Sequence, residues 1–302
     1  MSKAPHLVQY QGSKRNIAPE ILKYYPDTKI NRFIEPFSGT CAMTILTALE
    51  HKADSFIIND INGPLVELMK ECIEAPETLS SEYSTLWGGQ FEDGQDNVSY
   101  FYKIRDEFNN GKQDAARMLF LLARVVKGAV RYNSDGVMNQ SCDKRRNGTK
   151  PDIVLRNAVQ ISNLLKGKVE YHSTDYKDIL AMARPGDLVY MDPPYQGTSR
   201  TDNLRDNRYI QGVSFDEFVD ALQTLNRRGV DYLVSYDGRT GDKIIGKSLP
   251  DSLGLSHHYI NAGLSAQATL NGKKEITYES LYVSPGLYKH PEQYEQLTFK
   301  FA

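Results

Sequence analysis

The sequence predicts an α/β fold in which a largely parallel sheet is flanked by helices. Short apolar runs at 31–36 and 55–59 alternate with segments of helical spacing such as 42–50. This alternation is typical of βαβ units, whose strands lie parallel in one sheet. A further apolar run at 187–191 stops abruptly at an Asp-Pro-Pro sequence, as a buried strand does where it reaches the edge of its sheet.

The same criteria place the remaining elements. We expect strands at 31–36, 55–59, 169–172, 187–191, 231–235 and 279–283, and helices at 42–50, 64–72, 115–126, 153–165 and 215–227. The last helix has Ser214 as its expected N-cap and Glu217 at its third position, which predicts a capping box.

The α/β rhythm is interrupted in the middle of the chain. Residues 75–114 are polar, and residues 127–150 are loop-like and basic. The simplest organisation is a discontinuous α/β domain formed by residues 1–75 and 166–302, with residues 76–165 inserted between its two parts.

Composition excludes several classes of protein. The 302 residues are 40% hydrophobic and 25% charged, which is globular usage rather than that of a disordered chain or a coiled-coil rod. The net charge of −2 gives no general attraction to polyanions, so a nucleic acid would have to bind local basic patches. Three cysteines, with no CxxC or HExxH, predict neither a disulfide framework nor a zinc site. Without an apolar signal core or a bilayer-length apolar run, we expect a cytoplasmic protein.

The sequence Asp192-Pro193-Pro194-Tyr195 follows the apolar strand at 187–191. Ligands of parallel α/β sheets bind beyond the carboxyl ends of strands. The prolines fix the backbone, so the Asp192 carboxylate and the neighbouring carbonyl are held as two acceptors beside an aromatic ring. Two acceptors and a ring suit a planar group that bears an amino group.

Two further features suggest a nucleoside site. Glu35-Pro36-Phe37-Ser38-Gly39 lies between a strand and a helix, where a glycine lets the backbone approach a ligand closely. Asp60 ends the next strand, where a carboxylate can accept hydrogen bonds from a ribose diol. Gly39 and Asp60 are about 20 residues apart, the interval found in nucleoside-binding βαβ units.

These segments, in this order, resemble the DNA adenine-N6 methyltransferases of the Dam (D12, α) class. The matching segments are Tyr10–Arg15 to the W-A-G-G-K-R motif, Phe33–Gly39 to F-x-E-P-F-x-G, Asn59–Asn62 to A-D-I-N, Arg131–Asn133 to R-Y-N, and Asp192–Tyr195 to D-P-P-Y. The resemblance implies a Rossmann-like class I methyltransferase fold that uses S-adenosylmethionine, releases S-adenosylhomocysteine and has a mainly helical DNA-recognition insert at 76–165.

The resemblance also implies roles for individual residues. The target adenine would be held by Asp192 and the Pro193 carbonyl and stacked on Tyr195. The cofactor would be bound by Tyr10, Gly12, Lys14, Glu35, Phe37, Gly39, Asp60, Ile61, Asp175, Tyr176 and Asp192. Lys14, Lys127, Arg131 and Asn133 would approach the DNA.

Local positive charge suggests additional contacts to DNA. Lys144, Arg145 and Arg146 form one candidate patch, and Arg200, Arg205 and Arg208 beside the D-P-P-Y motif form another. A solvated loop explains each cluster as an alternative. Lys127 stands where Dam proteins that read GATC usually carry Asn, so we expect a recognition sequence other than GATC.

The expected activity is therefore methyl transfer to N6 of a flipped adenine in double-stranded DNA, in a restriction-modification or phage context and with a cognate restriction endonuclease as a possible partner. The expected chemistry needs no metal and no membrane. Three alternatives remain open: a methyltransferase acting on RNA or on a protein glutamine, a DNA-binding regulator that has lost catalysis, and a nicotinamide dehydrogenase. The last lacks a complete GxGxxG.

Overall fold

The computed structural model describes residues 4–194, 213–240, 243–264 and 276–287. Within these residues the strands form one sheet in the order β3-β2-β1-β4-β5-β8-β7, with β6 paired to β5. The strands are β1 (Phe33–Glu35), β2 (Phe56–Asn59), β3 (Val169–His172), β4 (Leu188–Met191), β5 (Asp231–Thr240), β6 (Lys243–Ile245), β7 (Ser256–Leu264) and β8 (Ile276–Val283).

The sheet is mixed, and its larger part is parallel. The pairs from β3 through β2, β1 and β4 to β5 are parallel, whereas β8 is antiparallel to both β5 and β7. This confirms the predicted α/β fold. Strand β7 was not expected from the sequence, because its exposed and half-buried residues give no apolar run.

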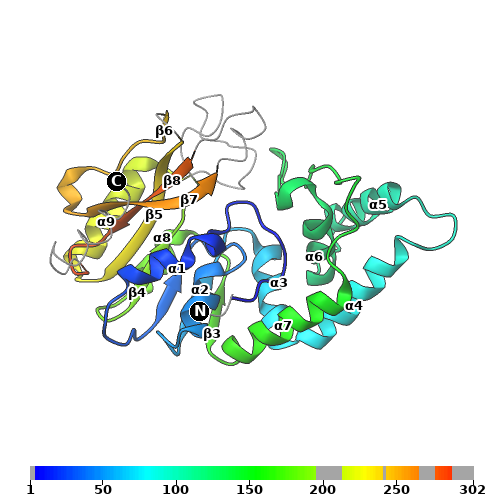
Figure 1. Cartoon of the computed structure of the whole chain (residues 1–302), viewed down its shortest axis with the longest axis horizontal. Helices are drawn as coiled ribbons and strands as arrows, with labels where there is room; N and C mark the ends of the chain where they lie inside the picture. Colours follow the sequence, from blue (N-terminus) through cyan, green and yellow to red (C-terminus); the bar gives the residue numbers. More distant parts are fainter. Residues whose placement is uncertain (1–3, 195–212, 241–242, 265–275, 288–302) are drawn as a thin grey trace.

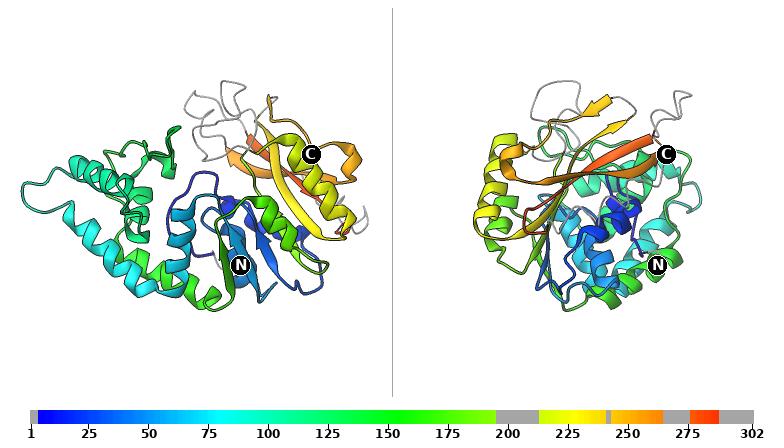
Figure 2. Two further views of the ribbon diagram at one scale, coloured as in Figure 1. Left: turned by 180° about the vertical axis from the view of Figure 1, so that it is seen from behind. Right: turned by 60° about the vertical axis from the view of Figure 1, so that its left-hand side comes forward.

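Residues alternate between the two faces of the sheet. Phe33, Phe56 and Leu188 belong to one buried cluster, which also holds residues of α1 (Ala18–Ile21), α2 (Ala42–Leu49) and α3 (Gly63–Glu74). The residues that follow them, Ile34, Ile57 and Val189, belong to a second cluster with α8 (Tyr176–Met182) and α9 (Phe215–Arg227). The core is thus layered helix, sheet, helix, as Figures 1 and 2 show.

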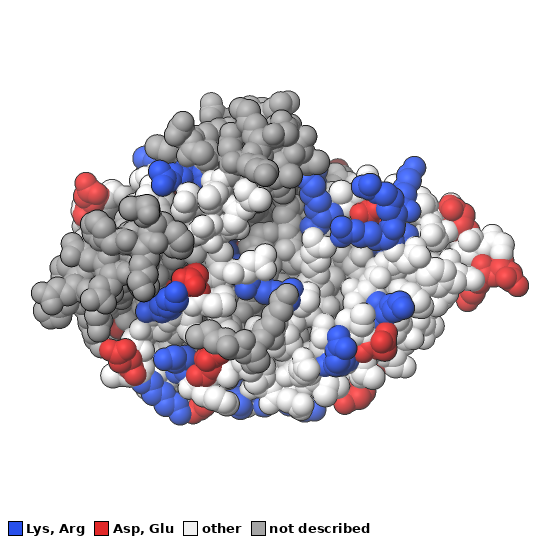
Figure 3. Space-filling view, in the orientation of Figure 1, with Lys and Arg blue, Asp and Glu red and all other residues white. Residues whose placement is uncertain are grey.

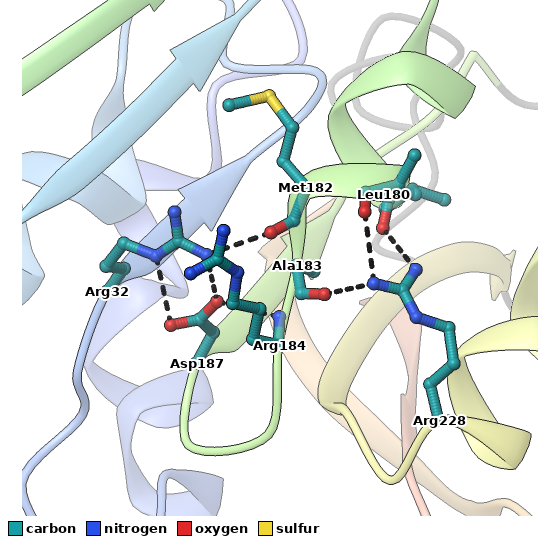
Figure 4. Close-up of polar contacts among 8 residues, drawn as sticks. Arg32, Leu180, Met182, Ala183, Arg184, Asp187 and Arg228 are labelled. Carbon is teal, nitrogen blue, oxygen red and sulfur yellow. Dashed lines mark hydrogen bonds and ion pairs between the residues drawn. The ribbon is translucent and has the colours of Figure 1, made fainter.

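An ion pair joins the amino ends of β1 and β4. Arg32 Nη2 lies 2.6 Å from Asp187 Oδ2, and the same nitrogen donates to the Met182 carbonyl (Figure 4). Beside it, Arg228 donates to carbonyls at the end of α8, including Leu180 and Ala183. These contacts satisfy helix-terminal carbonyls and fasten the edge of the sheet opposite the carboxyl ends of its strands.

The insert at 76–165 is mainly helical and lies to one side of the sheet (Figure 1). Its helices are α4 (Pro76–Gly89), α5 (Asn97–Asn109), α6 (Ala115–Arg124) and α7 (Pro151–Leu165). Helices α4 and α5 were not expected, because 75–114 is polar overall. Helix α3 packs on α6 and α7, so the insert shares a core with the sheet. The domain boundaries at 75 and 165 stay a prediction.

The expected helix at 115–126 is present as α6, and its Met118, Leu119 and Leu122, with Val125 directly after it, are buried as core. The capping box at α9 was wrong: Ser214 is the N-cap residue, but its side chain makes no cap hydrogen bond. Glu217 instead accepts from Lys177 Nζ at 3.0 Å, so its carboxylate is turned toward α8 and away from the Ser214 backbone.

Candidate active site

Strand order places the site at the centre of the sheet. Chain order reverses between β1 and β4, which is the point where doubly wound sheets bind ligands. The loop after β1 (36–41) and the Asp192-Pro193-Pro194 segment after β4 flank this point. Both segments line a single pocket.

Asn59, the last residue of β2, connects two loops beside this pocket. Its amide nitrogen donates to the carbonyls of Pro36 and Thr174, at 2.9 and 3.1 Å, and its amide oxygen accepts from the Thr174 N–H. The side chain is 1% exposed. Asn59 therefore holds the loop after β1 against the loop after β3, although the sequence reading assigned it no role.

Asp60 and Gly39 are in direct contact. The Gly39 N–H donates to Asp60 Oδ2 at 3.0 Å, and the Asn62 N–H donates to Asp60 Oδ1 at 2.9 Å. Burial raises the pKa of Asp60, and these two bonds oppose the rise. Each carboxylate oxygen keeps further acceptor capacity toward the pocket. A Cβ at Gly39 would lie 3.1 Å from the Tyr10 ring, so glycine permits this close approach.

The residue two positions after Gly39 is conformationally unusual. Cys41 has φ 58° and ψ 37°, the left-handed region that favours glycine, immediately before α2. The residue is fully buried in the core. Packing of its side chain compensates for a backbone conformation that costs an L-residue about 1 kcal/mol.

Lys14 lies inside the pocket, although a side chain this long usually reaches solvent. Its ammonium is 3.0 Å from Asp192 Oδ1 and 2.9 Å from Glu279 Oε2. Only 6% of the side chain is exposed. Burial by itself lowers the pKa of Lys14, but the two carboxylates outweigh it and raise that pKa above its usual range. The Lys14 side chain therefore lines the pocket and does not extend to the molecular surface.

Glu35 is a second buried acid at this end of the sheet. Its Oε2 accepts from the Thr44 N–H at 3.1 Å and from Thr44 Oγ1 at 2.6 Å. Burial is the main cause that raises the pKa of Glu35 to about 8, and the charge of Asp192 adds to the rise. Glu35 therefore holds its proton to a higher pH than an exposed glutamate does.

The predicted cofactor residues come together. All eleven line the one pocket: Tyr10, Gly12, Lys14, Glu35, Phe37, Gly39, Asp60, Ile61, Asp175, Tyr176 and Asp192. Pro193 also lines it, whereas Tyr195 lies outside the described residues. Tyr176 Oη is buried and has no hydrogen-bond partner among the described residues. Backbone loops, carboxylates and an unused hydroxyl fit a nucleoside ligand with a charged tail.

The residues assigned to DNA lie in a different environment. Figure 3 shows Lys and Arg gathered over the helical part of the molecule, around the 127–150 segment. The exposed members of the predicted set are Lys127, Arg131, Asn133, Lys144, Arg145 and Arg146. Arg146 is partly engaged, since it donates to Gln9 Oε1 at 3.0 Å and lies 3.5 Å from Asp143. Arg200, Arg205 and Arg208 lie outside the described residues.

Backbone conformation sets Lys127 apart from these residues. It has φ 61° and ψ 14°, again in the left-handed region. Asn and Gly adopt this region readily, whereas Lys does so at a cost. The exposed Lys127 is therefore held in this conformation by the turn around it.

The 127–150 segment is bonded to the rim of the pocket. Gln11 donates through its N–H to the Gly128 carbonyl at 3.0 Å, and Tyr132 Oη donates to Asn62 Oδ1 at 3.3 Å. A Cβ at Gly128 would lie 2.4 Å from the Gln9 carbonyl oxygen. Tyr132 and Asn62 line the pocket itself, so the exposed basic segment and the pocket share a wall.

Some polar residues of β5 and β7 are not part of the pocket. Ser235, Tyr236 and Asp237 are buried and do not line it; Tyr190 bonds Ser235, and Tyr282 donates to Asp237. The ring of His257 stacks on that of Tyr282 at 4.5 Å.

Within the described part of the chain, no group of three or more His, Cys, Asp or Glu could hold a metal ion. The helices of this part include none that could span a membrane.

The sheet order and the pocket at its centre fit a Rossmann-like methyltransferase fold. A family model described as D12 class N6 adenine-specific DNA methyltransferase matches residues 10–264. The chain belongs to this family and is therefore an enzyme that methylates adenine in DNA.

Individual relatives agree with this family. The Retron Ec67 DNA adenine methylase of Escherichia coli is 28% identical over 280 residues, which cover 90% of this chain and 88% of the relative. The type II methyltransferase M1.LlaDCHI of Lactococcus lactis subsp. cremoris is 28% identical over 75% of this chain and 79% of its own. Among solved structures, the rRNA methyltransferase aviRa of Streptomyces viridochromogenes covers 89% of this chain and 81% of its own at 12% identity, with a TM-score of 0.35. That value is low, so the assignment rests on the family match.

Proposed function

We propose that the protein transfers a methyl group from S-adenosylmethionine to N6 of an adenine turned out of duplex DNA. The observation that supports this most is the position of Asp192, which follows β4 at the centre of the sheet and shares one pocket with the ten other candidate cofactor residues. Bound there, S-adenosylmethionine supplies an electrophilic methyl group.

The residues of the chain would orient the acceptor. The lone pair of an adenine amino group is delocalised into the ring, which makes N6 a poor nucleophile. Asp192 and the Pro193 carbonyl are fixed by the prolines and can each accept one N–H. Drawing both hydrogens aside localises the lone pair toward the methyl group, so positioning and electrostatics supply the catalysis.

DNA would be held by the exposed basic residues of the 127–150 segment. The amino group of a paired base faces its partner, so the target must leave the duplex to reach Asp192. Lys127 stands where Dam proteins that read GATC usually carry Asn, which supports a recognition sequence other than GATC. A type II methyltransferase among the relatives supports a restriction-modification setting, in which a cognate endonuclease would cut unmethylated sites.

Expression in a host without adenine methylation, followed by genome-wide mapping of N6-methyladenine, tests this function and finds the recognition sequence. We expect one methylated motif, and we expect Asp192→Ala to abolish it while S-adenosylhomocysteine still binds. Methyl transfer within about tenfold of wild type in Asp192→Ala would contradict the assignment. Methyl groups found in RNA or protein but not in DNA would favour the alternative substrates.

A further inference from the structure

A charge cluster beside Asp192 contains one residue for which the proposed chemistry has no role. Glu279 of β8 and Asp192 after β4 both contact the Lys14 ammonium, at 2.9 and 3.0 Å. The exposed fractions are 6% for Lys14, 19% for Asp192 and 24% for Glu279. Two carboxylates therefore share one buried cation.

The strand itself directs Glu279 toward this cluster. Leu281, two residues later on β8, belongs to the same buried cluster as Phe33, so Glu279 is on that face of the sheet. The register between β5 and β8 shifts between Ser235 and Gly238, and Glu279 pairs with Gly238. The extra residue at this irregularity lies on β5, so β8 keeps its regular alternation and Glu279 stays on the face of Leu281.

This arrangement lets Lys14 divide its N–H donors between the carboxylates of Asp192 and Glu279. An ammonium has three N–H donors, and an ammonium bonded to Asp192 alone would direct more of them to that carboxylate. Those donors would compete with an amino group that must also bond to Asp192. With a second carboxylate present, Lys14 can shift toward β8 and still have an anionic partner, so no buried charge is left uncompensated.

We propose that Glu279 is a positioning residue for methyl transfer, which shares Lys14 with Asp192 and thereby keeps the Asp192 carboxylate able to accept hydrogen bonds from the target amino group. The inference rests on the proposed function and deepens it. Glu279 acts through Lys14 and does not itself contact the adenine.

A double-mutant cycle on the full-length protein tests the proposal. The variants are Glu279→Gln, Lys14→Met and the double variant, with Glu82→Gln on the exposed face of α4 as the matched control. Two quantities are measured: the single-turnover rate on a duplex carrying the mapped wild-type site, and the dissociation constant of S-adenosylhomocysteine.

We expect Glu279→Gln to lower the rate about tenfold, whereas its affinity for S-adenosylhomocysteine stays within about twofold of wild type. Added to Lys14→Met, the same change should alter the rate by less than about threefold, because no lysine remains to be shared. An unchanged rate in Glu279→Gln would overturn the proposal. An equal loss in both backgrounds would show that Glu279 does not act through Lys14.

Thermal unfolding keeps the test decisive if Glu279→Gln is too unstable for kinetics. The double variant should then be more stable than Glu279→Gln alone. In Glu279→Gln the Lys14 ammonium stays buried with only one of its two carboxylates, whereas Lys14→Met removes that ammonium. A double variant that is no more stable would overturn the proposal. Wild-type protein that methylates no adenine would instead contradict the proposed function, so the two failures are distinguishable.

Discussion

Glu35 is the residue whose ionisation most directly links the pocket to stability. Its pKa is raised from 4.5 to about 8, chiefly by burial. Between these values the folded chain retains a proton that the unfolded chain has released. The free energy of unfolding attributable to Glu35 is therefore greatest below the lower value, falls as the pH rises through this window and levels off above the higher one.

Glu35→Gln should remove this dependence, because the amide is neutral at every pH. We expect the melting temperature of the variant, relative to wild type, to rise between pH 5 and about pH 8 and to level off above that. Calorimetric melting of both proteins across this range measures the difference, with Glu82→Gln as the exposed control. A difference that is constant with pH would show that Glu35 is ionised in the folded protein.

Asn59 acts on the shape of the pocket through three hydrogen bonds. Asn59→Ala removes them and leaves buried backbone groups unpaired, so we expect a loss of about 3 kcal/mol of stability. The loops after β1 and β3 should separate, and affinity for S-adenosylhomocysteine should fall about tenfold. Denaturant unfolding and titration calorimetry measure the two effects.

Asn226 offers a matched control for this change. It donates to the Leu253 carbonyl and accepts from Tyr232 Oη, away from the pocket. Asn226→Ala should therefore destabilise the protein without changing ligand affinity. If both variants lose affinity equally, the loss comes from general destabilisation, and the positioning role of Asn59 is refuted.

At the scale of elements, Gly128 connects the basic segment to the pocket. It has φ 64°, and a Cβ there would lie 2.4 Å from the Gln9 carbonyl oxygen. Gly128→Ala must displace the chain that carries Tyr10. We expect it to weaken binding of both S-adenosylhomocysteine and duplex DNA, each by about tenfold.

Gly136 separates this clash from the cost of the backbone conformation. Its φ is 75°, but a Cβ there would meet no atom within 4 Å. Gly136→Ala therefore has a similar conformational cost, about 1 kcal/mol, without the clash. Calorimetry and DNA-binding assays on both variants decide the point: equal losses of affinity would show that the 127–150 segment and the pocket are not coupled through Gly128.

Elements with strong local signals were predictable from the sequence. Apolar runs identified β1, β2 and β4, and the polar residues that follow them gave much of the pocket. Helices α4 and α5 were missed because few of their residues are apolar; Leu79, Tyr83, Phe101, Ile104 and Phe108 form their buried faces. Glu279 and Asn59 could not be assigned, since Glu279 contacts Lys14 of η1 (Lys14–Asn16) and Asn59 contacts the loops after β1 and β3, all far away in sequence.

At the scale of the whole molecule, charge is distributed to suit one polyanionic partner. The net charge is −2, so the chain as a whole does not attract DNA. The 127–150 segment, whose Tyr132 lines the pocket, nevertheless presents Lys144 and Arg145 as exposed side chains. DNA affinity should therefore depend on this surface and fall steeply with salt.

Lys144→Gln and Arg145→Gln test this distribution together. For every phosphate that is no longer neutralised, the slope of log affinity against log salt should become shallower by about 0.9, so the double variant should bind more weakly at low salt and with a flatter dependence. Arg146 is left intact because its guanidinium bonds Gln9. Lys166→Gln, at the C-cap of α7, is the control and should leave the slope unchanged. A double variant with the wild-type slope would show that these two residues are a solvated loop surface, and that the charges guiding DNA to Asp192 lie elsewhere on the molecule.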